Sequence, residues 1–293
     1  MKKTLPLVLI AAFVIVDVVL IIGARRHVFQ TPPESDIVAR PVTPAAATAA
    51  PDDAQVSYDF DATRSIAISL ANDGALVLGP RTACTSTAER APITTSLDGG
   101  AKVTQVATGL VTVLGARAVS ASDLRIVGLD SDCTVREARS SDGGAKWTAS
   151  AAVSLWYADP KDEQRVVSPT GSGDVGCEVV SVSQITAESA RVGCADGSIK
   201  GTGDSGTTWT QRGRLDNLRV ATFLTPTAGY ALARYNGCAA NAFTTKDAGV
   251  TWQPGGCITG EPAQGIAASA NGLAAVVNDG LYVSSNGADW KQP

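Results

Sequence analysis

From Val56 to the C-terminus, the chain consists of short runs of alternating apolar and polar residues separated by turn-forming residues. Ser65–Leu70 and Ala75–Leu78 flank an Asn-Asp-Gly turn and have the period of two that is typical of a β-hairpin. Three more pairs follow this pattern: Arg117–Ser120 with Leu124–Gly128, Val179–Val182 with Ala190–Gly193, and Arg219–Leu224 with Tyr230–Arg234. The pattern predicts an all-β domain over residues 56–293.

The N-terminal segment has a different pattern. Leu5–Ala24 is a mostly apolar run of 20 residues, preceded by two lysines and followed by two arginines. A helix of about 20 apolar residues spans a bilayer, so we expect residues 5–24 to be a single-pass transmembrane signal-anchor, with residues 1–4 in the cytoplasm. The alternative is a cleaved signal peptide, whose apolar stretch is shorter and ends at a small-residue cleavage site.

Two features of this segment bear on its role. Asp17 lies in the middle of the apolar run, where a charge facing lipid is costly. It either contacts another membrane helix or is tolerated in a hydrated or protonated form. Residues 25–55 are rich in Pro, Ala and Thr without apolar periodicity, so we expect an extended linker that holds the β domain away from the membrane.

One motif recurs along the β domain. It is a hydroxyl residue, then Asp two positions later, Gly two further on and Trp at the end. Its clearest copy is Thr202–Trp209, and its last copy is one residue shorter and has Asn in place of Asp. The acidic or amide positions are 44, 62, 43 and 39 residues apart, and a period near forty is that of a four-stranded propeller blade.

The motif residues have separate physical roles. Hydroxyl and carboxylate oxygens bond nearby backbone N–H groups, Gly supplies positive φ at a tight reversal, and Trp buries a large ring between sheets. We therefore assign structural roles to Ser96, Asp98, Gly100, Ser140, Asp142, Gly144, Trp147, Thr202, Asp204, Gly206, Trp209, Thr245, Asp247, Gly249, Trp252, Asn286 and Trp290.

This pattern resembles the Asp-box, or bacterial neuraminidase repeat (BNR), of sialidase-type β-propellers and photosystem-II-assembly-factor-like propellers. In those families the repeat forms the hairpin between the third and fourth strands of a blade, away from the catalytic mouth. The resemblance implies an architectural role here. We expect five to six four-stranded blades and favour six, with Gln55–Phe60 supplying the last outer strand to close the ring. The long interval contains Thr148–Gly176, either an extra strand pair or a long loop.

Six cysteines downstream of an export segment indicate disulfides. Fifteen pairings are possible. In a propeller the cysteines fall on the rim opposite the repeated turns, where sequence neighbours become spatial neighbours, so we predict Cys84–Cys133, Cys177–Cys194 and Cys238–Cys257. The alternative is free buried thiols in a reducing compartment. Disulfides require the oxidising side, which places the C-terminal body outside the cytoplasm.

Charge and composition limit the partners, catalytic mechanisms and metal sites that we expect for this chain. The net charge is −4, and the basic residues beside the apolar run leave the rest more acidic, so we expect no nucleic-acid partner. The only histidine, His27, precedes the β domain, which excludes a Ser-His-Asp or Cys-His mechanism there. No Cys-x-x-Cys spacing occurs, and we expect neither a metal site nor a cofactor.

The long interval also contains the only Trp outside the motif. Trp156 and Tyr157 precede Asp159 and Lys161, and together they form a candidate contact surface for a protein or glycan. The alternative, which we favour for Trp156, is that its ring fills a gap between sheets.

Two functions fit these features. The first is a non-enzymatic, exported and membrane-tethered propeller that serves as a protein-binding or assembly scaffold in the cell envelope. The second is a sialidase-like glycoside hydrolase or carbohydrate-binding propeller. No Arg-Ile-Pro motif occurs, Glu is scarce in the β domain, and no spacing of acidic residues singles out a pair for glycoside chemistry. We therefore favour the scaffold and assign no catalytic residues.

Overall fold

The computed structural model describes residues 61, 64–85 and 88–293. In this part of the chain, 22 strands form six antiparallel sheets and no α-helix occurs. Four sheets have four strands in chain order: β1 (Ile66–Leu70), β2 (Leu76–Pro80), β3 (Pro92–Ser96) and β4 (Thr104–Ala107); β5 (Thr112–Ser120), β6 (Asp123–Leu129), β7 (Val135–Ser140) and β8 (Thr148–Ser150); β12 (Val179–Gln184), β13 (Ala190–Cys194), β14 (Ser198–Thr202) and β15 (Thr210–Arg214); β16 (Leu218–Phe223), β17 (Gly229–Tyr235), β18 (Cys238–Thr245) and β19 (Gln253–Ile258).

The other two sheets have three strands each. They contain β9 (Tyr157–Ala158), β10 (Arg165–Val167) and β11 (Ser172–Asp174) in the third sheet, and β20 (Ala263–Ser269), β21 (Gly272–Val277) and β22 (Gly280–Ser284) in the last.

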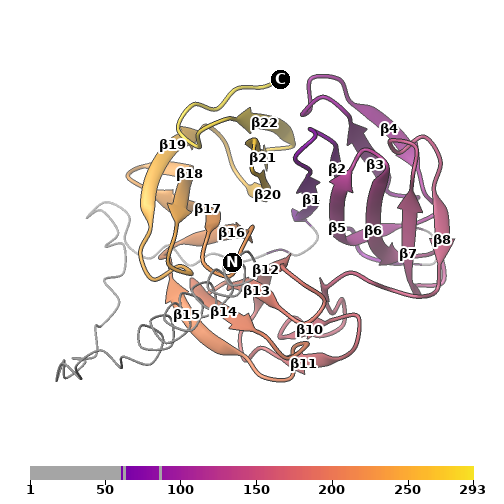
Figure 1. Ribbon diagram of the computed structural model, residues 1–293, viewed down its shortest axis with the longest axis horizontal. Coiled ribbons are helices and arrows are strands. Elements are labelled where there is room, and N and C mark those ends of the chain that lie inside the picture. The colour runs from indigo at the N-terminus through magenta and orange to yellow at the C-terminus, as the bar shows by residue number, and fades with distance from the viewer. Residues whose placement is uncertain (1–60, 62–63, 86–87) are drawn as a thin grey trace, which may run out of the picture. The chain divides into compact units, whose positions relative to one another are not determined.

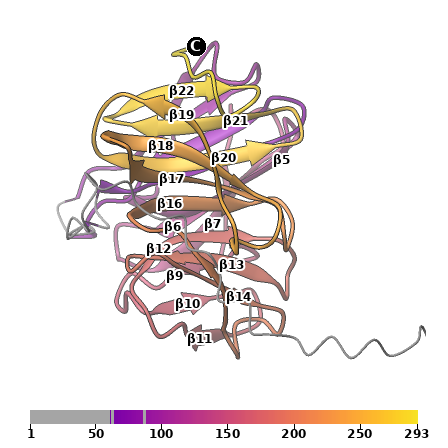
Figure 2. The ribbon, with the colours of Figure 1, turned by 90° about the vertical axis from the view of Figure 1, so that its left-hand side faces the viewer.

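The six sheets are the blades of a closed β-propeller (Figure 1). The innermost strands, β1, β5, β9, β12, β16 and β20, each contact the next one around the ring, and β20 contacts β1. Figure 2 views the ring from its left-hand side, where the sixth, fifth and fourth blades follow one another. The predicted all-β propeller with six blades is confirmed.

Apolar side chains lie on both faces of the second blade. In β6, Leu124 and Ile126 pack in a cluster shared with the first blade, while Val127 packs against Leu155 and Tyr157 at the third blade. Successive residues of a strand point to opposite faces. The second blade is therefore buried between its two neighbours.

The long interval between motif copies contains a three-stranded blade of its own, so the expectation of an extra strand pair or a long loop was wrong. The third blade lacks the motif, but its Ser168 Oγ accepts a hydrogen bond from Gly171 N at 2.9 Å. Ser284 Oγ accepts the same bond from Gly287 N in the last blade, also at 2.9 Å. A shorter Ser-x-x-Gly turn replaces the full motif there, which is why the spacing concealed this blade.

The third blade also runs in the opposite direction at the ring centre. Trp156, just before β9, donates its backbone N–H to the side-chain oxygen of Gln184 at the end of β12, at 3.3 Å. Val179 at the start of β12 donates to Glu163 O, beyond the end of β9. Thus β9 is antiparallel to β12, and this blade corresponds to the second, third and fourth strands of the others.

Some predictions concern residues outside the described part. These are the anchor at 5–24, its flanking residues 1–4, the linker at 25–55 and the closing strand at 55–60. Within the residues described, no helix is long and apolar enough to cross a membrane. Lys291 forms an isolated antiparallel bridge with Val283, which gives the last blade one residue of a fourth strand.

Candidate functional site

The repeated motif forms the turn after the third strand of each blade in which it occurs. In four copies the first hydroxyl donates to the Asp carboxylate at 2.7–2.9 Å and accepts from the Gly N–H at 2.9–3.2 Å. The Asp carboxylate also accepts from the backbone N–H four residues later, at 2.8–3.0 Å. These Gly residues have φ between 88° and 102°, a region that favours glycine.

The last copy replaces the carboxylate with an amide. Asn286 Oδ1 accepts from Ser284 Oγ at 3.1 Å and from Asp289 N at 2.9 Å, so the turn closes with the same geometry. In the third copy, hydrogen bonds from the hydroxyls of Thr202 and Thr208 lower the pKa of Asp204 to about 2. The carboxylate is committed to holding its own turn, which is an architectural task.

The four motif tryptophans lie at the junctions between blades. Trp147 and Trp290 donate their indole N–H to Gly144 O and Gly287 O of their own turns, at 2.9 and 3.1 Å. Trp252 packs edge-on against Phe223, with 6.2 Å between ring centroids, in a cluster that also contains Ile199 of the preceding blade. Each ring therefore joins its blade to the one before it.

Three disulfides connect the cysteines in the predicted pairs, Cys84–Cys133, Cys177–Cys194 and Cys238–Cys257. They lie on the side of the ring opposite the motif turns, where the first and third strands begin and the second and fourth strands end. We call this side of the ring the stapled face and the other side the turn face.

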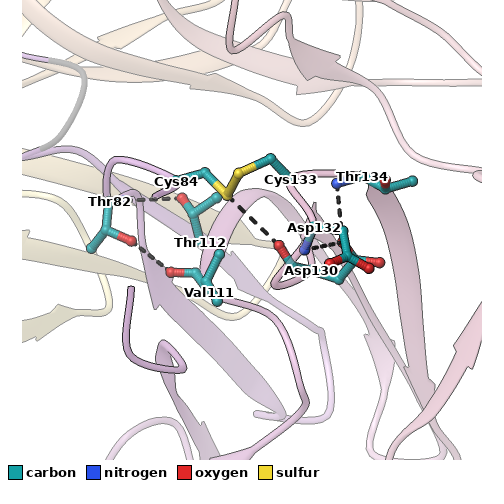
Figure 3. Close-up of a disulfide and its surroundings, with 8 residues drawn as sticks. All are labelled: Thr82, Cys84, Val111, Thr112, Asp130, Asp132, Cys133 and Thr134. Carbon is teal, nitrogen blue, oxygen red and sulfur yellow. Dashed lines mark hydrogen bonds between the residues drawn. A yellow bond between two sulfur atoms is a disulfide. The ribbon is translucent and has the colours of Figure 1, made fainter. Parts of the chain in front are cut away.

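The first disulfide joins two blades (Figure 3). Beside it, Thr82 of the first blade donates its hydroxyl to Val111 O at 2.6 Å and its N–H to Thr112 Oγ1 at 2.9 Å. On the Cys133 side, Asp130 Oδ1 accepts from Thr134 N at 3.0 Å. The loops of the first and second blades are thus fixed to each other covalently and by hydrogen bonds.

A narrow channel runs along the ring axis, and Ser65 and Arg81 line its mouth at the stapled face. Its cavity has a volume of about 110 Å³ and is lined by the innermost strands and by Arg81. Burial lowers the pKa of Arg81, while the negative charges of Glu163 and Asp159 raise it. An arginine from the first blade therefore faces two carboxylates of the third blade across the channel mouth.

A second hollow borders this mouth. It has a volume of about 260 Å³ and is lined by Arg64, Gln264 and Asp279 among others. Gln264 donates to Asp279 Oδ1 and accepts from Asp279 N, both at 2.7 Å. These two hydrogen bonds hold the side chains of Gln264 and Asp279 in place at the rim of the hollow.

The four residues of the predicted contact surface are divided by the fold. Trp156 and Tyr157 are buried, with 3% and 8% of their surface exposed. Trp156 packs edge-on against Trp209, and its indole donates to Thr186 O at 3.2 Å. Asp159 is half-buried and Lys161 exposed, both in the loop after β9 on the stapled face. The rings fill the junction between blades, and only the charged pair is presented outward.

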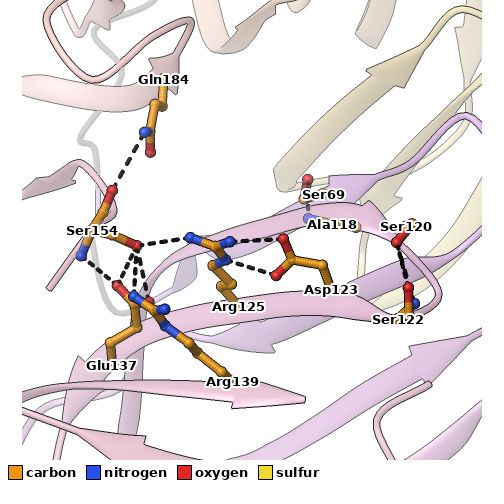
Figure 4. Close-up of polar contacts among 10 residues, drawn as sticks. All are labelled: Ser69, Ala118, Ser120, Ser122, Asp123, Arg125, Glu137, Arg139, Ser154 and Gln184. Atoms are coloured by element: carbon orange, nitrogen blue, oxygen red, sulfur yellow. Dashed lines mark hydrogen bonds and ion pairs between the residues drawn. The ribbon is translucent and has the colours of Figure 1, made fainter. Parts of the chain in front are cut away.

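The densest charged cluster lies on the second blade (Figure 4). Arg117, Arg125 and Arg139 are direct neighbours across β5, β6 and β7. Arg125 bonds both oxygens of Asp123 at 2.7 Å. Arg139 bonds Glu137, which is fully buried, at 2.5 Å. The sequence signals are the Asp-Leu-Arg and Glu-Ala-Arg triplets, in which alternate residues share one face of a strand.

This cluster ties the second blade to the third. Ser154 donates its hydroxyl to Glu137 at 2.9 Å and accepts from Arg125 and Arg139 at 3.3 Å. The hydrogen bond from Arg125 lowers the pKa of Asp123. A carboxylate held ionised by an arginine is a poor proton donor, which favours a structural role for Asp123. Across the residues the structure describes, no group of three or more His, Cys, Asp or Glu could hold a metal ion.

Comparison with protein-family models and with curated proteins gave no match. Among solved structures, the chain is similar to YCF48 bound to a D1 peptide (17% identity, TM-score 0.32, 82% of this chain and 72% of that one). It is also similar to YCF48 from Cyanidioschyzon merolae, with 14% identity and a TM-score of 0.34 over 79% of this chain and 85% of that one. A third similar structure is the GH74 xyloglucanase from Xanthomonas campestris, with 17% identity and a TM-score of 0.32 over 79% of this chain and 38% of that one. These likenesses concern the fold and do not assign a ligand.

Proposed function

We propose that this protein is a membrane-tethered propeller outside the cytoplasm that holds a protein partner on its stapled face. The observation that carries the proposal is the position of the three disulfides on that one side. Cross-links that fix loops before binding reduce the entropy lost when a partner docks. The turn face carries the repeated motif, whose polar side chains are occupied in their own turns.

The chemistry of the stapled face supports a protein partner. Arg64, Arg81 and Lys161 lie there with Asp159 and Glu163, so charges of both signs surround the channel mouth. Interfaces use such mixed charges to fix orientation and to exclude wrong partners. The apolar N-terminal run and the linker of the sequence support attachment to the membrane, and the disulfides support an oxidising compartment.

Site-specific photo-crosslinking in the full-length, membrane-embedded protein tests the proposal. A photoreactive residue at Lys161, on the stapled face, is expected to give one discrete protein adduct. The same residue at Lys146, exposed in the motif turn of the second blade, is the matched control and is expected to give none. The charge reversal Arg81→Glu is expected to reduce the Lys161 adduct several-fold. Equal crosslinking from both positions, or none from Lys161, would contradict a partner on the stapled face.

Location is tested separately in intact cells. The proposal expects that a membrane-impermeant amine reagent labels Lys161 and that no free thiol is alkylated before reduction. Deletion of residues 1–27 is expected to release the protein from the membrane fraction. Six alkylatable thiols in the native protein would contradict the placement outside the cytoplasm.

A further inference from the structure

Three arginines of the second blade form a row, and one of them differs from the other two. Arg117, Arg125 and Arg139 lie side by side on β5, β6 and β7. Arg125 bonds Asp123 and Arg139 bonds Glu137 (Figure 4). Within the part of the chain that the structure describes, the guanidinium of Arg117 has no hydrogen bond and no ion pair. The arginine row thus has three cations and two carboxylates.

The sequences of the three strands show which group is missing beside Arg117. Each of the other two arginines lies two positions after a carboxylate, in Asp-Leu-Arg and Glu-Ala-Arg, whereas Arg117 lies two positions after Gly115 in Gly-Ala-Arg. The register places Gly115 and Glu137 at equivalent positions, because both pair with Val127 of β6. A Cβ atom on Gly115 would lie 2.9 Å from the backbone oxygen of Trp156. The backbone before β9 therefore leaves no room for an acidic side chain at this position.

The unmatched charge is unfavourable in the free protein. Arg117 and Arg125 are directly opposite each other on neighbouring strands, and like charges in that arrangement destabilise a sheet. Burial lowers the pKa of Arg117, and the charge of Arg125 lowers it further, by more than the charge of Asp123 raises it. An anion beside Arg117 would relieve this repulsion and balance the third cation of the row.

The arginine row is open to solvent but bordered by the third blade. Arg117 is partly exposed, and 29% of the Arg125 side chain and 44% of the Arg139 side chain are exposed. Ser154, in the loop before β9, bonds both Arg125 and Arg139. Arg117 itself lies on β5, the innermost strand of its blade. A small group can therefore reach its guanidinium more readily than a broad protein surface can.

We propose that Arg117 binds the carboxylate of a small organic acid. The occupant is inferred from the row, in which both other arginines hold a carboxylate, and from the single positive charge that is left over. Arg125 shows the geometry, because its Nε and Nη2 atoms donate to the two oxygens of Asp123 at 2.7 Å. A planar guanidinium offers a carboxylate two parallel N–H groups in this way. The site lies between the second and third blades, so this inference is independent of a partner on the stapled face.

The test uses the full-length protein with isotope-labelled arginine and follows the Nε–H signals by NMR during titration with acetate at constant ionic strength. The signal of Arg117 is identified by its loss in the Arg117→Met variant. We expect this signal to shift with a dissociation constant on the order of 10 mM. Acetamide, which has the shape of acetate without its charge, should cause no shift. Arg212, exposed on β15 of the fourth blade, is the matched control and should bind acetate at least tenfold more weakly.

The melting temperature gives a second measurement. Arg117→Met keeps an apolar stem and removes the charge, so this variant should melt at a higher temperature than the wild type. Acetate, compared with chloride at the same ionic strength, should raise the melting temperature of the wild type only. A lower melting temperature of the variant would show that Arg117 stabilises the free chain, which contradicts an unmatched charge. Equal shifts of Arg117 and Arg212, no shift of Arg117, or tenfold tighter binding of inorganic phosphate than of acetate would each overturn the proposal.

Discussion

Asn271 donates its side-chain amide to the backbone oxygen of Asn72 at 2.6 Å, across 199 positions of sequence. Asn72 Oδ1 in turn accepts from Ala270 N at 2.8 Å. The turn between β1 and β2 is thereby joined to the turn between β20 and β21. This pair of bonds holds the first blade to the last on the turn face.

The double variant Asn72→Ala/Asn271→Ala should weaken this closure. It removes two hydrogen bonds at an exposed site, which contribute about 1–2 kcal/mol together. Urea unfolding measures the loss, and hydrogen exchange should show faster opening in β1 and β20 than in β12 and β16. Gln253→Ala, an exposed change without such a bond, is the control and should change neither quantity. Uniform exchange across all blades would contradict a local seam.

The first disulfide should stabilise the fold more than the other two. Cys84–Cys133 closes a separation of 49 residues, against 17 for Cys177–Cys194 and 19 for Cys238–Cys257. Loop-closure entropy gives about 4 kcal/mol for the first and about 3 kcal/mol for each of the others. Paired Cys→Ser variants, compared by denaturant unfolding under oxidising conditions, test this order. A smaller loss for the first pair would show that loop length does not govern the effect here.

Acid should weaken the repeated turns over a defined pH range. The pKa of Asp204 is lowered from 3.8 to about 2. Its contribution to folding is therefore present above the unfolded pKa, near pH 4, and is lost as the pH falls toward 2. Thr202→Val removes the first hydrogen bond to this carboxylate and should raise its pKa, as followed by NMR titration.

The matched control for this turn is Thr207→Val. Thr207 donates its hydroxyl to the backbone oxygen of Asp204 at 2.9 Å, not to the carboxylate. The pKa of Asp204 should therefore stay near 2 in that variant. The stability difference between Thr202→Val and the wild type should shrink as the pH falls from neutral to 2. A difference that is constant with pH would mean that the carboxylate does not contribute.

Two of the three arginine–carboxylate pairs on the second blade should differ in their effect on stability. Arg139→Ala leaves the fully buried Glu137 without its cation, whereas Arg125→Ala leaves Asp123, which is one-third exposed, to solvent. We expect a loss of about 2 kcal/mol for Arg139→Ala and about 0.5 kcal/mol for Arg125→Ala. Denaturant unfolding at neutral pH measures both. Equal losses would show that burial of the carboxylate is not the deciding factor.

The hairpins and turns that could be predicted from the sequence are formed by residues that lie close together in the chain. The alternation in Ser65–Leu70 and the Asn-Asp-Gly turn after it specify a hairpin through contacts a few residues apart. The hydroxyl, Asp and Gly of Thr202–Trp209 close their own turn for the same reason. The cysteine pairs followed once strand order in a propeller was assumed, because that order brings sequence neighbours together.

Other features depend on groups that meet only in three dimensions. The third blade has a Ser168–Gly171 turn with no Asp or Trp, and its β9 is reversed, which no spacing signalled. Trp156 is buried because Trp209, 53 positions later, packs against it. The arginine row is visible only in the register of β5, β6 and β7, since Arg117 and Arg139 belong to separate strands.

By itself, the sequence determined the strands, their turns and the repeat that joins blades, because these arise from neighbouring residues and from one pattern used many times. Only the tertiary structure decided how the ring of blades closes and which side chains are buried at each junction. The physical reason is that a junction is formed by two blades. Leu70 and Val283, which are 213 positions apart in the sequence, line one cavity only because the last blade closes against the first.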